Sequence, residues 1–342
     1  MMKLGVLGCG GIAGAHLRAA ARLRQAKVVH LADANLDTAH ELADDFGIEK
    51  ISSDPACMID DDEVEAVIIA LPTHLHYDWI VRCAEAGRHV LTEKPLCRTV
   101  RQGRRAIAVC DRQGVKLRVG YMRRYNPLRG KVRQLVQSNK LGRPVTWTIA
   151  SYGPRSDFCR GPGNWMWDMQ KGGGLVLDGN IHDFDFAAWV LGRPVRIFAQ
   201  SKCISPEVTA PTQATATVQF ERGDTLQFAA SWQEGDFGSG GAPESIVGPK
   251  GTIVFDGEAG FWWHYAPGKQ RYTRVEWDKY KPAGIGSQWV FRKQLESFVR
   301  LVRSDSADSR LVTGEEALDS LWIAEKIVEA GPKGRMYRRS DK

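Results

Sequence analysis

Short apolar runs alternate with longer amphipathic segments over the first 120 residues of the chain. Continuous apolar runs are typical of strands that are buried on both faces of a parallel sheet, and the segments between them repeat with the period of a helix. This alternation predicts a doubly wound α/β domain of the Rossmann kind. The predicted strands are 4–7, 27–32, 65–70, 89–92 and 116–120, and the predicted helices are 12–23, 36–46, 74–86 and 100–112.

The pattern changes after residue 120, where segments that alternate apolar and polar residues replace the continuous runs. Such alternation indicates strands with one buried face, and two helical patterns close the chain at 288–303 and 314–330. We therefore predict two domains, 1–121 with a parallel sheet and 122–342 with an antiparallel one. Within the second, we expect a helix at 126–137 and strands at 144–152, 195–203, 213–220, 225–233, 252–255 and 272–277.

Composition narrows the class of protein. The 342 residues are 25% charged and 43% hydrophobic, as in an ordinary globular enzyme. The N-terminus enters an apolar strand at once, without the successive regions of a signal peptide. The seven cysteines are scattered singly, which is typical of reduced thiols. These features predict a cytoplasmic protein without a membrane anchor.

The formal net charge of +7 suggests a nucleic-acid partner as one hypothesis. The basic residues are spread along the chain, however, and their densest cluster is the terminal segment 335–342. Nucleic-acid binding requires basic residues that gather on one face, whereas a mildly positive surface is enough to attract an anionic cofactor. We predict no nucleic-acid partner.

A glycine-rich segment follows the first predicted strand and opens the first predicted helix. Gly8 permits the tight turn, Gly10 lets the main chain approach a pyrophosphate, and Ala13 is the small third residue of a dinucleotide fingerprint. Asp33 ends the second predicted strand, 20 residues after Ala13, where a carboxylate can bind the ribose hydroxyls. Because this carboxylate repels a 2′-phosphate and no arginine follows it, NAD is predicted rather than NADP.

A second polar pattern lies in the segment 172–185, GGGLVLDGNIHDFD. Asp178, His182 and Asp185 are spaced four and three residues apart, so a helix would carry them on one face. A helix-capping contact or a contact in the core also explains an Asp–His pair four residues apart. Lys94, however, ends an apolar run upstream, after the dinucleotide fingerprint. The three features in this order form a combination more specific than any one of them.

Four segments, in the same order over most of the chain, resemble the glucose-fructose oxidoreductase, inositol dehydrogenase and rhizopine-catabolism (Gfo/Idh/MocA) family. They are GCGGIAGAH at 8–16, AGRHVLTEKPL at 86–96, VGYMRRYNP at 119–127 and GGGLVLDGNIHDFD at 172–185. The motifs YMRRYNP and IHDFD are most similar to the inositol dehydrogenase branch. The resemblance implies a Rossmann domain, a C-terminal α/β domain with an open, mostly antiparallel sheet, and oxidation or reduction of a sugar or cyclitol.

The resemblance also implies roles for individual residues. The catalytic lysine of the family's E-K-P motif falls on Lys94, and its aspartate and histidine fall on Asp178 and His182. The chain departs from inositol dehydrogenases at Asn126, where Asp is usual, and at Asn180, where Thr or a similar residue is usual. These departures leave the chemistry intact and the identity of the sugar open.

The chemistry of a dehydrogenase fits these residue types. Oxidation of a secondary alcohol needs a base for the hydroxyl proton, and histidine, with an ordinary pKa of about 6.5, suits neutral pH. Asp178 can orient the His182 imidazole, and the Lys94 ammonium can stabilise the developing alkoxide. No metal is required, and we expect His74 and His76 to line or cap the cofactor cleft rather than to bind one.

The candidate residues form two groups. The cofactor-binding candidates are Gly8, Gly10, Gly11, Ile12, Asp33, Leu71, Pro72, Thr73, His76, Glu93 and Lys94. The substrate-binding candidates are Lys94, Arg123, Arg155, Asn164, Trp165, Asp178, Asn180, His182 and Asp185, with Arg160 and Asp168 beside them at the rim.

The sequence leaves alternatives to a cyclitol or sugar dehydrogenase. Arg155 and Arg160 can pair with a phosphate, which favours a nucleotide-sugar or sugar-phosphate dehydrogenase as the nearest rival. A non-catalytic dinucleotide-binding sensor is a further alternative, although a sensor has no need of Lys94, Asp178 and His182 together. An open sheet needs cover, so we also expect a homodimer or homotetramer.

Overall fold

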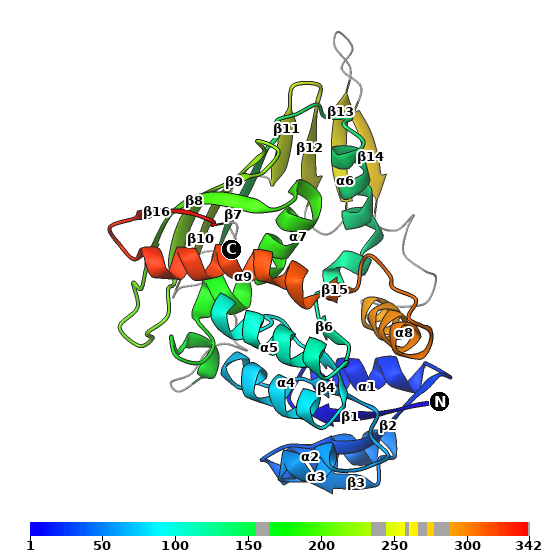
Figure 1. Ribbon diagram of the computed structural model, residues 1–342. Coiled ribbons are helices and arrows are strands. Elements are labelled where there is room, and N and C mark those ends of the chain that lie inside the picture. Colours follow the sequence, from blue (N-terminus) through cyan, green and yellow to red (C-terminus); the bar gives the residue numbers. More distant parts are fainter. Residues whose placement is uncertain (155–163, 234–243, 257–259, 266–271, 277–287, 341–342) are drawn as a thin grey trace. The chain divides into compact units, whose positions relative to one another are not determined.

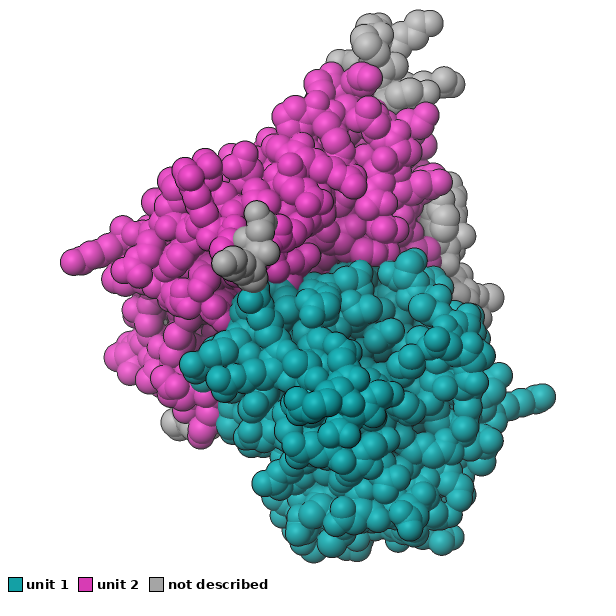
Figure 2. All heavy atoms as spheres, in the orientation of Figure 1, with its two compact units in different colours: residues 1–125, 284–318 teal, residues 126–283, 319–342 magenta. Residues whose placement is uncertain are grey.

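The computed structural model describes residues 1–154, 164–233, 244–256, 260–265, 272–276 and 288–340. The chain divides into two compact units, which Figure 2 distinguishes by colour. The first unit contains Met1–Tyr125 and Gly284–Leu318, and the second contains Asn126–Ala283 and Asp319–Lys342. None of the helices in the described part of the chain is long and apolar enough to cross a membrane.

The first unit is built on a seven-stranded sheet of order β15-β6-β5-β4-β1-β2-β3 (Figure 1). Strands β1 to β6 are parallel, and the short β15 is antiparallel to β6. Its strands are β1 (Met2–Leu7), β2 (Ala26–Ala32), β3 (Lys50–Ser52), β4 (Ala66–Ile69), β5 (His89–Thr92), β6 (Leu117–Val119) and β15 (Val312–Thr313). Its helices are α1 (Ala13–Ala21), α2 (Leu36–Phe46), α3 (Pro55–Ile59), α4 (His76–Glu85), α5 (Val100–Arg112) and α8 (Trp289–Ser304), with short 3₁₀ turns η1 (Thr73–Leu75) and η2 (Met122–Tyr125).

The strand order explains where a ligand can bind in the first unit. Every residue of β4 is buried, as expected for a strand covered on both faces. The chain order reverses between β1 and β4, which are neighbours in the sheet. In doubly wound sheets this switch point opens a crevice at the carboxyl ends of the strands, which is the usual place for a dinucleotide. The predicted Rossmann fold is confirmed.

Helix α8 belongs to the first unit, whereas its residues were predicted in the second. The ring of Phe291 on α8 meets the ring of His16 on α1 edge-on, with 5.4 Å between the ring centres. The amphipathic pattern correctly gave the helix, but a helical pattern does not say which sheet the apolar face covers. The division of the chain is therefore not a single cut near residue 121.

The second unit contains a nine-stranded sheet of order β14-β13-β12-β11-β7-β10-β9-β8-β16. Among the described strands, β7 and β10 are the one parallel pair of neighbours, so the predicted mostly antiparallel sheet is confirmed. The strands are β7 (Thr146–Pro154), β8 (Pro194–Lys202), β9 (Gln213–Phe220), β10 (Thr225–Gln233), β11 (Ser245–Gly248), β12 (Gly251–Asp256), β13 (Gly260–Tyr265), β14 (Tyr272–Glu276) and β16 (Arg335–Arg338). The helices are α6 (Pro127–Gln137), α7 (Ile181–Leu191) and α9 (Gly314–Ala330), whose first residues lie in the first unit.

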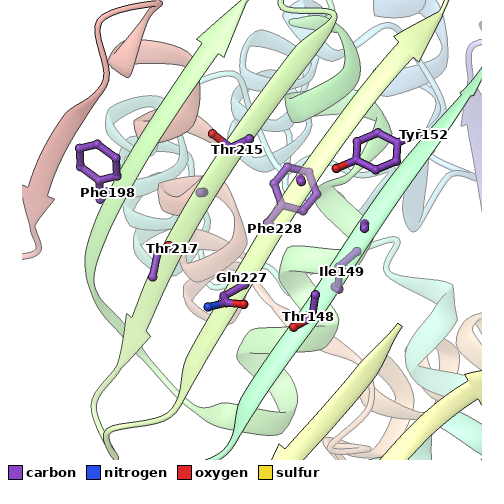
Figure 3. Close-up of a pocket in the computed structure, with 11 residues that line it drawn as sticks. Thr148, Ile149, Tyr152, Phe198, Thr215, Thr217, Gln227 and Phe228 are labelled. Atoms are coloured by element: carbon purple, nitrogen blue, oxygen red, sulfur yellow. The ribbon is translucent and has the colours of Figure 1, made fainter. Parts of the chain in front are cut away.

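One face of this sheet is covered by helix α7. Phe184 on α7 meets Phe228 on β10, and Phe186 meets Trp147 on β7, with 4.9 Å between ring centres in both pairs. The other face carries exposed side chains in the described part of the sheet, since β9 alternates buried and exposed residues along its whole length. Figure 3 shows this open face over β7, β8, β9 and β10, where the side chains form a shallow groove.

Candidate active site

The glycine-rich turn has the geometry that a dinucleotide requires. Gly8 adopts a φ of +95°, and a Cβ there would lie 2.6 Å from the carbonyl oxygen of Ala70, so only glycine fits between β1 and β4. Gly10 faces open space. Helix α1 begins after Ile12 with no side-chain cap and no acidic residue in its first turn. The positive end of the helix dipole, with no carboxylate beside it, therefore suits an anionic phosphate.

Asp33 is held at the end of β2 by the main chain around it. Its carboxylate accepts hydrogen bonds from the N–H of Cys9 at 2.6 Å and from the N–H of Asn35 at 2.8 Å. The first of these bonds ties Asp33 to the glycine-rich turn itself. The carboxylate is thus fixed where the fingerprint predicts the ribose.

The loop after β4 adds a polar atom without a partner. Thr73 is buried, and its hydroxyl has no hydrogen-bond partner among the described residues. A buried hydroxyl left in this state costs free energy that a ligand hydroxyl or phosphate can offset. Leu71 and Pro72 precede it in the same loop, so the structure keeps these predicted cofactor residues together beside β1. The residues present therefore fit a dinucleotide.

His76, also predicted to bind the cofactor, lies wholly inside the first unit. Its Nδ1 is 2.7 Å from the carbonyl oxygen of Pro95 and its Nε2 is 2.8 Å from that of Leu71. Burial lowers the pKa of the His76 imidazole. His76 thus joins the loop after β4 to the segment after β5, rather than presenting a nitrogen to a ligand.

The E-K-P segment follows β5, and its three residues differ in exposure. Glu93 and Pro95 are buried, while Lys94 is half-buried, and the Lys94–Pro95 peptide bond is cis. Glu93 Oε1 lies 2.8 Å from Nε2 of His16, and Glu93 Oε2 accepts the N–H of Lys94 at 3.1 Å. His16 was missed by the sequence analysis because 77 residues separate it from Glu93.

In the second unit, the segment with Asp178 and His182 is not one α-helix as predicted. A π-helical turn η5 (Leu175–Gly179) carries Asp178, and α7 begins after Asn180 with His182 and Asp185 on it. The N–H of Asn180 donates to the carbonyl of Leu175, five residues back, at 2.8 Å. Such wide turns are rare and are frequent at functional sites.

The turn η5 is positioned by the glycines before it. Gly174 adopts a φ of +68°, and a Cβ there would lie 2.7 Å from the Cβ of Ala210. The run of glycines thus lets the chain pass close to the segment before β9. Asp178, His182 and Asp185 are all buried. Two carboxylates and an imidazole on one short segment are the residue types of acid-base chemistry, so this cluster is a candidate site.

A tryptophan pair lies near this cluster in the second unit. A 3₁₀ turn η4 (Trp165–Trp167) begins at Asn164, whose side chain accepts the N–H of Met166. The buried Trp167 ring meets Trp232 of β10 with 4.2 Å between centres, and a Cβ on Gly179 would lie 3.0 Å from the Trp232 ring. Trp232 therefore packs beneath η5. Its role was not predicted, since it lies 65 residues beyond Trp167 in the chain.

The remaining predicted substrate residues lie in different settings. Arg123 is half-buried on η2, and its neighbour Arg124 is buried in an ion pair with Glu316 at 2.9 Å. Asn180 donates to the Asp183 carboxylate at 3.1 Å. The side chain of Asn126 caps α6, which an Asp would do equally well. Asp168 accepts the N–H of Gln170, and Arg155 and Arg160 lie outside the described residues.

Comparison with known families identifies both halves of the chain. Residues 2–121 match the model of an oxidoreductase family with an NAD-binding Rossmann fold, and residues 130–254 match the GFO/IDH/MocA C-terminal domain. These matches span more than half of the chain. The chain belongs to the Gfo/Idh/MocA oxidoreductase family, which confirms the resemblance and the NAD-binding domain.

Individual members of the family can also be compared with the chain. The chain is 30% identical over 224 residues to the oxidoreductase YrbE of Bacillus subtilis, 64% of each chain, and 30% identical over 210 residues to the myo-inositol 2-dehydrogenase of Thermotoga maritima, 60% of each. It therefore matches slightly less than two thirds of their length. It is 27% identical over 336 residues to the rhizopine catabolism protein MocA of Rhizobium meliloti, 96% of this chain and 94% of that one.

Solved structures share the fold. Levoglucosan dehydrogenase in complex with NADH and levoglucosan has a TM-score of 0.84 at 23% identity, and the match covers 96% of both chains. The WlbA dehydrogenase of Bordetella pertussis, solved with NADH and UDP-GlcNAcA, has a TM-score of 0.81 at 21% identity, covering 100% of this chain and 99% of that one. Both likenesses extend over the two units.

Cofactor preference gives a first prediction. NAD should bind at least about tenfold more tightly than NADP, or about 1.4 kcal/mol, because Asp33 is fixed at the ribose position. Asp33→Ser combined with Ala34→Arg should narrow or reverse this ratio. The matched control is Asp37→Ser, which removes an exposed carboxylate of α2 nearby. Titration of both cofactors measures the ratio, and equal affinities for the unaltered protein would contradict the prediction.

Proposed function

We propose that the protein is an NAD-dependent dehydrogenase that transfers hydride between nicotinamide and a secondary hydroxyl of a cyclitol or sugar. In this proposal His182 removes the hydroxyl proton, Asp178 orients its imidazole, and Lys94 stabilises the alkoxide charge. The glycine-rich turn and Asp33 would hold NAD, which would supply the hydride acceptor. An inositol-like cyclitol is the first substrate to test, given the similarity to a myo-inositol 2-dehydrogenase.

The observation that carries the proposal is the burial of Asp178, His182 and Asp185 around the turn η5. A fold does not need two carboxylates and an imidazole inside it, and placing them there costs free energy. Carboxylates and imidazoles that gather on one segment are candidates for general acid-base chemistry. The adjacent Trp232 ring is half-buried beside Gly179, and an aromatic ring of this kind can cover the C–H face of a sugar ring.

The test is a substrate panel with NAD. Inositols, aldoses, glycosides and sugar phosphates are offered in turn, and the absorbance of the reduced cofactor is followed. Turnover of a cyclitol or unphosphorylated sugar supports the proposal, whereas turnover of sugar phosphates alone supports the rival that depends on Arg155 and Arg160. Tight NAD binding without turnover of any member of the panel would favour the sensor.

We also propose that the protein works as a homo-oligomer in the cytoplasm. The cytoplasm is supported by the scattered cysteines of the sequence. The oligomer is supported by the open face of the second sheet, on which Phe198 and Met336 are cross-strand neighbours, 54% and 57% exposed. Phe198 continues a row through Thr217 and Gln227 to Thr148 (Figure 3). Large apolar residues on an uncovered sheet face mark an interface between copies of the chain.

Substitution on this face should change the oligomeric state. Phe198→Asp places a charge within the proposed interface, and we expect a smaller species in light scattering coupled to gel filtration. Leu36→Asp is the matched control, since Leu36 is 40% exposed on α2 of the first unit. The same mass for Phe198→Asp and the unaltered protein would contradict an interface through this face.

A further inference from the structure

The main chain around Lys94 is held from inside the first unit. Glu93 is buried, and its carboxylate has two named contacts, Nε2 of His16 at 2.8 Å and the N–H of Lys94 at 3.1 Å. The second contact reaches the residue that carries the reactive ammonium. The Glu93 side chain therefore connects a buried histidine on α1 to the main chain of the proposed catalytic lysine.

The carboxylate has little freedom to move. Gly120 lies against it so closely that a Cβ there would be 3.0 Å from Glu93 Oε1 and 3.2 Å from Glu93 Cα. The main-chain N–H of Glu93 donates to Ile69 of β4 at 2.8 Å. Burial alone would raise the pKa of the Glu93 carboxyl group, but the hydrogen bond and charge of His16, together with Lys94, lower it. The net shift of the Glu93 pKa is downward, which is consistent with its contacts to His16 and to the main chain of Lys94.

Among the described residues, the imidazole of His16 makes one polar contact, which is the contact with Glu93. His16 is 1% exposed, its ring packs edge-on against Phe291, and its Nδ1 has no hydrogen-bond partner among the described residues. The contact with Glu93 is therefore the polar contact that accounts for a histidine at this place in the core. A buried histidine whose one partner is a buried carboxylate is costly as a packing element, so a role through that partner is the better explanation.

A second histidine contacts the residue that follows Lys94 in the chain. His76 contacts the carbonyl oxygen of Pro95 at 2.7 Å, and Pro95 directly follows Lys94. Both chain neighbours of Lys94 are thus fixed by buried imidazoles, from α1 and from α4. This leaves the half-buried Lys94 side chain to project from a rigid main chain.

We propose that His16 is a positioning residue for Lys94, acting through the Glu93 carboxylate to fix the main chain from which the ammonium projects. The inference rests on the proposed catalytic role of Lys94. It matters for rate because catalysis depends on placement, and a displacement of about 1 Å at a reacting group can cost about 10²-fold in rate. Substrate and NAD binding, to which many other residues contribute, should be affected much less.

A matched pair of amides tests the proposal. In His16→Gln the side-chain amide nitrogen takes the place of Nε2 and can still donate to Glu93, whereas in His16→Asn the amide is too short to reach it. Both variants bury a neutral amide, so their melting temperatures should be similar. We expect kcat within about threefold of the unaltered enzyme for His16→Gln and a loss of about 10-fold to 10²-fold for His16→Asn, with KM and the Kd for NAD changed by less than about threefold.

A buried histidine elsewhere in the first unit provides the control for general destabilisation. His30 on β2 contacts Asp61 at 3.0 Å and Ser52 at 3.2 Å, and neither partner belongs to the E-K-P segment. His30→Asn should lower the melting temperature and leave kcat of the folded enzyme unchanged at saturating NAD. A comparable fall of kcat in His30→Asn would assign the His16→Asn effect to lost stability and overturn the inference.

A double variant separates this inference from the proposed function. If His16 acts through Lys94, His16→Asn should have no further effect on kcat in the Lys94→Ala background. Independent, multiplying losses would overturn the positioning role while leaving Lys94 catalytic. Full turnover in Lys94→Ala itself would instead overturn the proposed function, and the two failures are thereby distinguishable.

Discussion

His182→Ala should lower kcat by about 10² to 10⁴-fold while the affinity for NAD stays nearly unchanged. The imidazole is the base in the proposed reaction, and NAD binds through residues of the first unit. Alanine is a good helix former, so the second residue of α7 should tolerate it. The rate is measured with the best substrate of the panel, and cofactor affinity by quenching of tryptophan fluorescence.

Two further variants make the result for His182 interpretable. His40→Ala removes an exposed histidine of α2 and should leave kcat unchanged. Asp178→Asn should cost less than His182→Ala if the carboxylate only orients the imidazole, and about as much if it also binds the reacting hydroxyl. If kcat of His182→Ala equals that of the unaltered protein, this mechanism is excluded. A different base, or the hypothesis of a non-catalytic sensor, would then be favoured.

Lys94→Ala should cause a loss of kcat comparable to that of His182→Ala, because the ammonium stabilises charge that develops only in the transition state. Lys27→Ala, at an exposed lysine of β2 in the same unit, is the matched control. A raised KM with kcat preserved would show that Lys94 only binds substrate.

Local patterns in the sequence predicted most of the fold, including the glycine-rich turn and the strand end at which Asp33 lies. Gly8 and Asp33 were identified because a tight turn and a strand end each have a signature within a few residues. The helix 36–46 matches α2 in full for the same reason, since Asn35 caps its start and Gly47 ends it. Signals of this kind depend on neighbouring residues alone, so they can be recognised without knowledge of tertiary contacts.

Features that depend on distant partners were not predictable. His16 and Glu93 meet across 77 residues, and nothing next to either residue indicates the other. The short strands β3 and β11 were missed because three or four residues carry too little periodicity to distinguish from a loop. Strand β16 was taken for a basic tail, and it is a strand because it pairs with β8. The turn η5 likewise depends on the close approach of Gly174 to Ala210.

The central claim is that hydride passes from a carbinol carbon of the substrate to NAD. The most direct test uses the best cyclitol or sugar of the panel with deuterium in place of hydrogen on its carbinol carbons, and mass spectrometry of the reduced cofactor. The account predicts one deuterium in each reduced cofactor molecule and no such label when the solvent alone is deuterated. Reduced cofactor without deuterium from the labelled substrate, or with deuterium from the solvent, would contradict it.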